Sequence, residues 1–177
     1  MTPEFSRPER VDNISERERV VEVEARPAER EALARRFDLI AVERLTASFA
    51  IRREHAGLTA RGKVTADVVQ ACSITGEPVA SQVDEQADLL FVPAGPGGAA
   101  AGEAEVELSA DALDTIIYEG SKIDLGEAAA ETMALALDPF PRAPGAERTL
   151  REAGVLTEEE ARPLGKLAGL RDKLEGR

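Results

Sequence analysis

The sequence contains few of the residues that build disulfides, metal centres or stacking surfaces. It has one cysteine, Cys72, and one histidine, His55, which excludes an intramolecular disulfide and a zinc site made of several Cys and His ligands. Tryptophan is absent and aromatic residues make up 3% of the chain, so there is no obvious platform for stacking unpaired RNA bases. No apolar run approaches the roughly 18 residues of a membrane-spanning helix, and the N-terminus lacks the apolar core of a secretory signal. We therefore expect a cytoplasmic protein with no cofactor and no bound metal.

The chain has 177 residues, which is about one domain, and 43% of them are hydrophobic, which is enough for a lean core. Its 22 Lys and Arg against 34 Asp and Glu give a formal net charge of −12. Binding to nucleic acid gains its affinity when Lys and Arg displace counterions from phosphates. The net charge therefore disfavours a protein that binds a phosphate backbone over its whole surface, although a local basic patch stays possible.

The charge is distributed unevenly along the chain. Residues 26–63 carry 9 basic and 5 acidic side chains, a net of +4, whereas residues 64–138 carry 1 basic and 15 acidic side chains, a net of −14. Two interpretations of the acidic block stay open. It is either a solvated surface that keeps the protein soluble or a surface that attracts a basic partner.

Alternating apolar residues predict several strands. Residues 17–25 form the first, and Leu45 to Arg52 and Leu58 to Val68 alternate on either side of a turn at 54–57, which is typical of a long antiparallel hairpin. A third long strand at 79–91 follows a turn at 72–78, and one of its faces carries Val79, Ser81, Val83, Glu85, Ala87, Leu89 and Phe91. Consecutive strands joined by short turns indicate a β-meander.

Helix signals flank these strands. Pro27 at a first helical position predicts a helix over 27–37. Asp124, with Glu127 three residues later, predicts a capping box and a helix that ends before Pro139. A short strand is expected at 115–118.

The predicted fold class is α+β, with an antiparallel β-meander sheet, flanking helices and a docked C-terminal helix. Residues 1–145 are expected to form one domain with a flexible Gly- and Pro-rich loop at about 93–105. Residues 146–177 are expected to form a tail with a short amphipathic helix, whose apolar edge is Leu164, Leu167, Leu170 and Leu174.

No catalytic constellation is visible. His55 lies at a hairpin turn beside Gly57, where an exposed histidine is expected, and Cys72 lies at a strand end without a second histidine to activate it. The Gly95–Gly98 stretch leads into no phosphate-binding helix with a Lys-Ser/Thr pair. We therefore predict a protein that is not an enzyme, with Cys72 as a structural or partly buried thiol.

Several stretches, taken in order, resemble the YceD-type family, the large ribosomal RNA subunit accumulation proteins of bacteria and plastids, and especially the branch seen in alphaproteobacteria. They are residues 3–8, 27–37, 62–79, 123–127, 135–142 and 163–167. The resemblance implies a role in the accumulation or maturation of large-subunit (23S) ribosomal RNA, with no catalytic residues to carry over. Many relatives have Cys-x-x-Cys where this chain has Cys72 and Thr75, and one thiolate alone cannot hold zinc.

The leading hypothesis is a non-enzymatic ribosome-biogenesis factor that binds precursor large-subunit RNA, a ribosomal protein, or both. The candidate RNA contacts are Arg52, Arg53, Arg61 and Lys63, unless these are ordinary strand-surface charges. The candidate contacts to a basic partner are Asp84, Glu85, Asp88, Glu103, Glu105 and Glu107. The alternatives are a general acidic interaction module or chaperone without a ribosomal role, and an enzyme whose carboxylates converge in one pocket.

Overall fold

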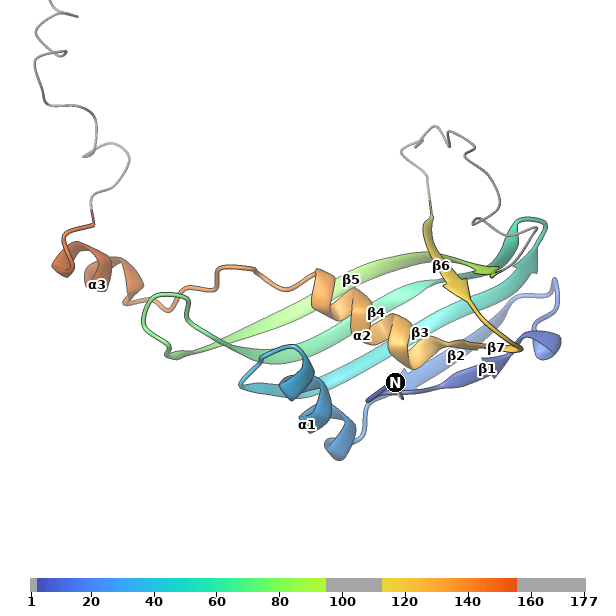
Figure 1. Cartoon of the computed structure of the whole chain (residues 1–177), viewed down its shortest axis with the longest axis horizontal. Coiled ribbons are helices and arrows are strands. Elements are labelled where there is room, and N and C mark those ends of the chain that lie inside the picture. Colours follow the sequence, from blue (N-terminus) through green and yellow to red (C-terminus); the bar gives the residue numbers. More distant parts are fainter. Residues whose placement is uncertain (1–2, 95–112, 156–177) are drawn as a thin grey trace, which may run out of the picture.

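A long, twisted five-stranded sheet dominates the computed structural model, which describes residues 3–94 and 113–155 (Figure 1). Its strands lie in the order β2, β3, β4, β5 and β6. Their bounds are Arg19–Glu24, Ala41–Glu54, Gly57–Ala71, Pro78–Pro93 and Asp114–Tyr118. Strands β2 to β5 pair antiparallel with their neighbours in chain order, which confirms the predicted meander and the α+β class.

The last strand departs from this pattern. Strand β6 runs parallel to the end of β5, where Leu89 to Pro93 pair with Asp114 to Tyr118. The sheet is therefore mostly, and not wholly, antiparallel. A parallel neighbour needs a long connection rather than a tight turn, and β5 and β6 are separated by 20 residues, from Ala94 to Leu113.

A second sheet, of two strands, joins the N-terminal segment to residues 122–124. Strand β1 (Pro8–Arg10) pairs antiparallel with β7 (Lys122–Asp124), and a one-turn 3₁₀ helix, η1, follows at Val11–Asn13. Neither strand was predicted, because three residues carry too little alternation to signal a strand.

Helices α1 (Pro27–Arg36) and α2 (Leu125–Leu135) agree with the predicted positions. The Asp124 carboxylate caps α2 by accepting the N–H groups of Gly126 and Glu127. The predicted capping box does not form, because the Glu127 carboxylate instead accepts two hydrogen bonds from Arg36 of α1, at 2.6 and 2.9 Å. This pair ties the two helices together on one side of the sheet.

A further helix, α3 (Ala146–Glu152), lies where the sequence indicated only a tail. Its first residue, Ala146, packs with Cys72 and Ala143 in a small buried cluster at the far end of the sheet. The predicted loop at 93–105 begins inside β5 at Pro93, and most of it lies outside the described residues. The predicted C-terminal amphipathic helix also lies outside them.

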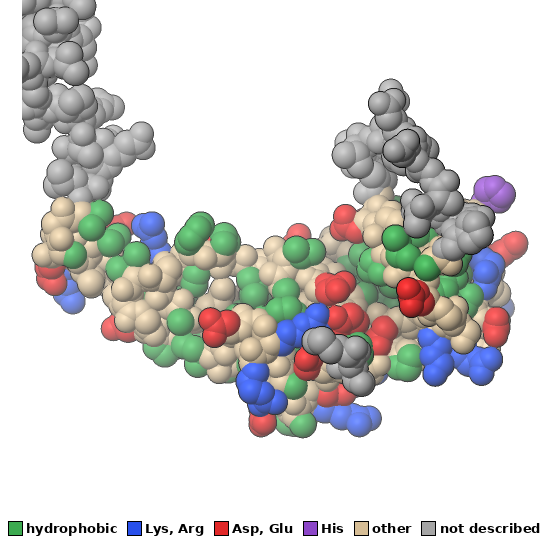
Figure 2. Space-filling view, in the orientation of Figure 1, with side chains coloured by type: hydrophobic (Ala, Val, Ile, Leu, Met, Phe, Trp, Pro, Cys, Tyr) green, Lys and Arg blue, Asp and Glu red, His purple; other side chains and the backbone are tan. Residues whose placement is uncertain are grey.

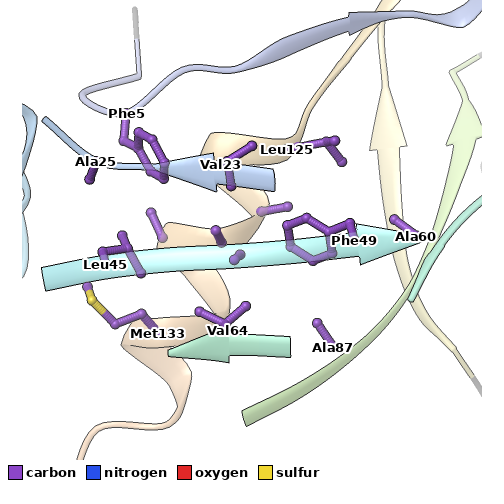
Figure 3. Close-up of a cluster of buried hydrophobic side chains, with 14 of the residues drawn as sticks. Phe5, Val23, Ala25, Leu45, Phe49, Ala60, Val64, Ala87, Leu125 and Met133 are labelled. Carbon is purple, nitrogen blue, oxygen red and sulfur yellow. The ribbon is translucent and has the colours of Figure 1, made fainter. Parts of the chain in front are cut away.

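The core fills the space between the sheet and α2 (Figure 3). The predicted alternation is confirmed, because Leu45, Phe49 and Ile51 of β3 are at most 1% exposed. Strand β4 adds Leu58, Ala60, Val64, Ala66 and Val68, and α2 adds Leu125, Ala129 and Met133. No helix in the described part of the chain is long and apolar enough to cross a membrane.

Candidate functional site

The face of the five-stranded sheet that points away from α2 is called here the outer face. Its side chains alternate with the buried ones along each strand, and no helix of the described residues covers it. Most of these side chains are exposed or half-buried. The outer face is formed by Val20, Glu22, Glu24, Arg44, Thr46, Ser48, Ala50, Arg52, Thr59, Arg61, Lys63, Thr65, Asp67, Gln82, Asp84, Gln86 and Asp88.

Two of the predicted RNA contacts meet two of the predicted partner contacts on this face. Arg61 lies directly opposite Asp88, with 3.6 Å between Nε and Oδ1. The Lys63 ammonium lies 2.8 Å from Oδ1 of Asp84, one position along. The structure therefore combines the basic and acidic candidates into cross-strand ion pairs instead of two separate patches.

The two remaining basic candidates have different environments. Arg52 lies on the outer face and pairs with Glu54, and this hydrogen bond lowers the pKa of the Glu54 carboxyl. Arg53 faces the opposite way. Its guanidinium donates to the carbonyl oxygens of Ile14 and Val11, at 3.1 and 2.7 Å, and so holds the η1 segment against β3. Arg53 is thus engaged in the fold and is not grouped with the other three.

The acidic candidates also divide. Asp84 and Asp88 lie on the outer face, whereas Glu85 lies on the other side of β5, between Val83 and Ala87. Both neighbours are buried, yet Glu85 is exposed. Glu103, Glu105 and Glu107 lie outside the described residues.

The outer face carries mixed charge rather than one sign. Its four basic residues, Arg44, Arg52, Arg61 and Lys63, each form an ion pair, and their side chains are 40–55% exposed. Exposed ion pairs contribute little, about 0–1 kcal/mol each, so a ligand can replace either partner at small cost. Figure 2 shows that basic and acidic side chains are also interspersed on the side of the molecule that carries the helices.

A shallow hollow of about 530 Å³ lies beside Lys63 on the outer face. Hydroxyl groups of Thr46, Ser48 and Thr65 line it, together with carboxylates of Glu22 and Glu24. The Thr46 and Thr65 hydroxyls are hydrogen-bonded to each other at 2.8 Å. The hollow exposes both polar and apolar surface, since Val23 and Ala47 also line it, so its lining alone does not select a class of ligand.

Cys72 follows β4 and is 3% exposed, as expected of a structural thiol. Its sulfur accepts the backbone N–H of Ala143 at 3.3 Å and of Thr75 at 3.4 Å. Hydrogen bonds to sulfur favour the thiolate. The N–H of Ala143, followed by Thr75, lowers the pKa of the thiol to about 6.

This shift predicts a pH-dependent stability. A thiol whose pKa is lowered on folding stabilises the native state above its unfolded pKa of about 8.5, and this contribution is lost as the pH falls through about 6. The urea midpoint of the native chain should therefore rise between pH 6 and pH 8.5 relative to that of Cys72→Ser. A constant difference between the two proteins over this range would contradict the assignment.

Within residues 3–94 and 113–155, no three His, Cys, Asp or Glu side chains group as metal ligands. Among these residues, Cys72 therefore has no group of metal ligands around it. Thr75, three residues after Cys72, turns its N–H toward the sulfur.

The described residues define a mixed α+β protein with one helix-covered sheet face and one open face of paired charges. The chain belongs to the YceD family, described as "Large ribosomal RNA subunit accumulation protein YceD", whose family model matches residues 60–172. No curated protein and no solved structure matches the chain. The match begins in β4 and includes β5, α2 and α3. The narrower likeness to the alphaproteobacterial branch stays a prediction.

Proposed function

We propose that this protein is a non-enzymatic factor, active in the cytoplasm, that supports the accumulation of large-subunit ribosomal RNA by binding a precursor particle through the outer face. Membership of the YceD family supports the ribosomal role. The observation that carries the binding surface is the open face of the sheet, on which every basic side chain sits in a weak, half-exposed ion pair.

The ion pairs give the face two ways to bind. If a phosphate displaces Asp88 or Asp84, Arg61 and Lys63 become contacts to RNA. If a Lys or Arg of a ribosomal protein displaces Arg61 or Lys63, the same carboxylates become contacts to protein. Because each charge already has a partner, either ligand exchanges one ion pair for another. We expect the affinity of such binding to be low, and its selectivity to come from the positions of the charges on the outer face.

The first test reverses both basic charges with Arg61→Glu and Lys63→Glu. We expect the double variant to co-sediment with large-subunit precursors about tenfold less well, since two exposed pairs contribute up to about 1 kcal/mol each. The amount of large-subunit RNA relative to small-subunit RNA should fall in cells that carry only this variant. The matched control is Arg148→Glu with Arg151→Glu on α3, which makes the same change of charge elsewhere.

A second variant separates the two ligands. Asp84→Lys with Asp88→Lys removes the carboxylates and leaves Arg61 and Lys63 without their partners. If RNA is the direct ligand, this variant binds precursors as well as the native chain or better. If a basic protein is the ligand, it binds worse. Equal binding by the native chain and both double variants would remove the outer face from the proposal.

A further inference from the structure

Strand β5 has a long edge that no described residue pairs with. Strand β6 covers only Leu89 to Pro93, whereas residues 78–88 pair with β4 on one side alone. Figure 1 shows β5 as the upper edge of the sheet, with β6 near one end of it. Every second residue of an edge strand points its N–H and C=O outward, so this stretch presents about five such residues.

The side chains along this edge are acidic on both faces of the sheet. Asp84 and Asp88 point to the outer face and are 64% and 60% exposed. Glu85 points to the opposite face, is exposed, and takes part in none of the ion pairs of the described residues. An added strand would therefore have carboxylates above and below its main chain.

We propose that residues 78–88 of β5 accept an extended basic polypeptide segment, which adds to the sheet as a further strand. The inference rests on the proposed function and names the class of partner, a cationic protein segment. Main-chain hydrogen bonds would supply the pairing. Lys or Arg at alternate positions would reach Asp84 and Asp88 on one face, and intervening cations would reach Glu85 on the other.

Two other occupants fit this edge less well. A second copy paired edge to edge would bring its own Asp84, Glu85 and Asp88 against the same carboxylates, and like charges across strands are destabilising. An inward charge such as Glu85 is also a common protection of edge strands against self-association. RNA would bring phosphates to these three carboxylates. The carboxylates thus disfavour a second copy and favour a cationic strand over RNA, whose phosphates would first have to displace Asp84 and Asp88 from Lys63 and Arg61.

The test uses the full-length chain and a labelled twelve-residue peptide of alternating Lys and Thr. We expect saturable binding by fluorescence anisotropy, and slower amide hydrogen exchange in residues 78–88 but not in the other edge strand, β2. Two further peptides, N-methylated at either the odd or the even positions, identify main-chain pairing. One of the two should lose binding, because only one set of N–H groups faces β5.

The matched variants are Asp88→Lys on β5, on the face that the lysines of the alternating peptide reach, and Glu31→Lys, an exposed glutamate of α1. We expect Asp88→Lys to weaken peptide binding by about threefold to tenfold, given the small energies of exposed pairs, and Glu31→Lys to change it less than twofold. Any one of three results would overturn the inference. The two N-methylated peptides could bind equally, or the two variants could have equal effects. The chain could also bind a twelve-nucleotide single-stranded RNA more tightly than the peptide.

Although the inference rests on the proposed function, failure of the one can be distinguished from failure of the other. A chain that fails to bind the peptide but still supports large-subunit RNA accumulation would remove the β5 edge and leave the ribosomal role. If the chain binds the peptide but cells that lack the chain accumulate large-subunit RNA normally, the ribosomal role is removed and the β5 edge remains as a binding site.

Discussion

Replacing Gly62 by alanine is expected to lower the free energy of unfolding by about 3 kcal/mol, at the upper end of overpacking costs. Gly62 lies in β4 opposite Phe49 of β3. A Cβ atom built on it would lie 1.9 Å from the carbonyl oxygen of Ser48 and 2.9 Å from the Cα of Phe49. Both obstacles are backbone atoms, so no side-chain rotation relieves the clash, and β3 and β4 must separate.

The matched control for this variant is Gly145→Ala. Nothing lies within 4 Å of a Cβ atom at Gly145, and its φ of −91° is open to any residue. We expect a change below about 1 kcal/mol there. Urea unfolding followed by circular dichroism measures both variants. A Gly62→Ala midpoint equal to that of Gly145→Ala would show that β3 and β4 adjust freely.

The close approach at Gly62 matters for the binding surface, because the same two strands carry Arg52, Arg61 and Lys63. Separation of β3 from β4 would shift the basic side chains relative to β5 and break the register that pairs Arg61 with Asp88. Gly62→Ala is therefore expected to lose precursor binding through misfolding. It serves as the reference for a folding defect beside the charge reversals, which should cost much less stability because they place only exposed like charges across strands.

The local parts of the fold could be predicted from the sequence. The β3–β4 hairpin follows from strict alternation around a turn, and α1 and α2 follow from Pro27 and Asp124 at their starts. These signals act over a few residues. They predict which side chains face the core, and they place Arg61 and Lys63 on the opposite side correctly.

The non-local parts could not be predicted in the same way. Strands β1 and β7 join residues 8–10 to 122–124, and nothing in either short stretch specifies the other. The parallel pairing of β6 depends on a connection and not on a local pattern. The ion pairs Arg61–Asp88 and Lys63–Asp84 required the register of β4 on β5, which the turn between Ala71 and Pro78 sets. Given that turn, the mixed character of the outer face could have been predicted.

Glu85 shows that the alternation of residues along a strand predicts which face a side chain is on, but not whether it is buried. The pattern places it on the same face of the strand as Val83 and Ala87, and it does point to that face. It stays exposed, although Val83 and Ala87 on either side of it along the same face are buried. Alternation specifies the side of a strand, whereas burial depends on what packs against it, and that information lies elsewhere in the chain.

The second large effect is expected at Asp124, whose carboxylate joins the N-terminal segment to α2. One oxygen accepts the N–H groups of Arg7, Gly126 and Glu127 at 2.7, 3.0 and 3.2 Å, and the other accepts the Ser6 hydroxyl. The backbone of the N-terminal segment lies close to the first turn of α2, because a Cβ on Gly126 would lie 2.6 Å from the carbonyl oxygen of Phe5. Phe5 is fully buried, so this contact also fixes an edge of the core.

Asp124→Ala removes the cap of α2, worth about 1 kcal/mol, and leaves the donors of Ser6 and Arg7 without a partner, at about 1 kcal/mol each. We expect the free energy of unfolding to fall by about 3 kcal/mol, and Asp124→Asn to lose much less because Asn also caps helices well. Amide exchange at Arg7, Gly126 and Glu127 should accelerate most. The control is Asp138→Ala, an aspartate that accepts one exposed N–H, that of Phe140 at 2.9 Å. If Asp124→Ala costs no more than Asp138→Ala, the N-terminal segment contributes little to holding α2, and the core beneath this helix must be stable without it.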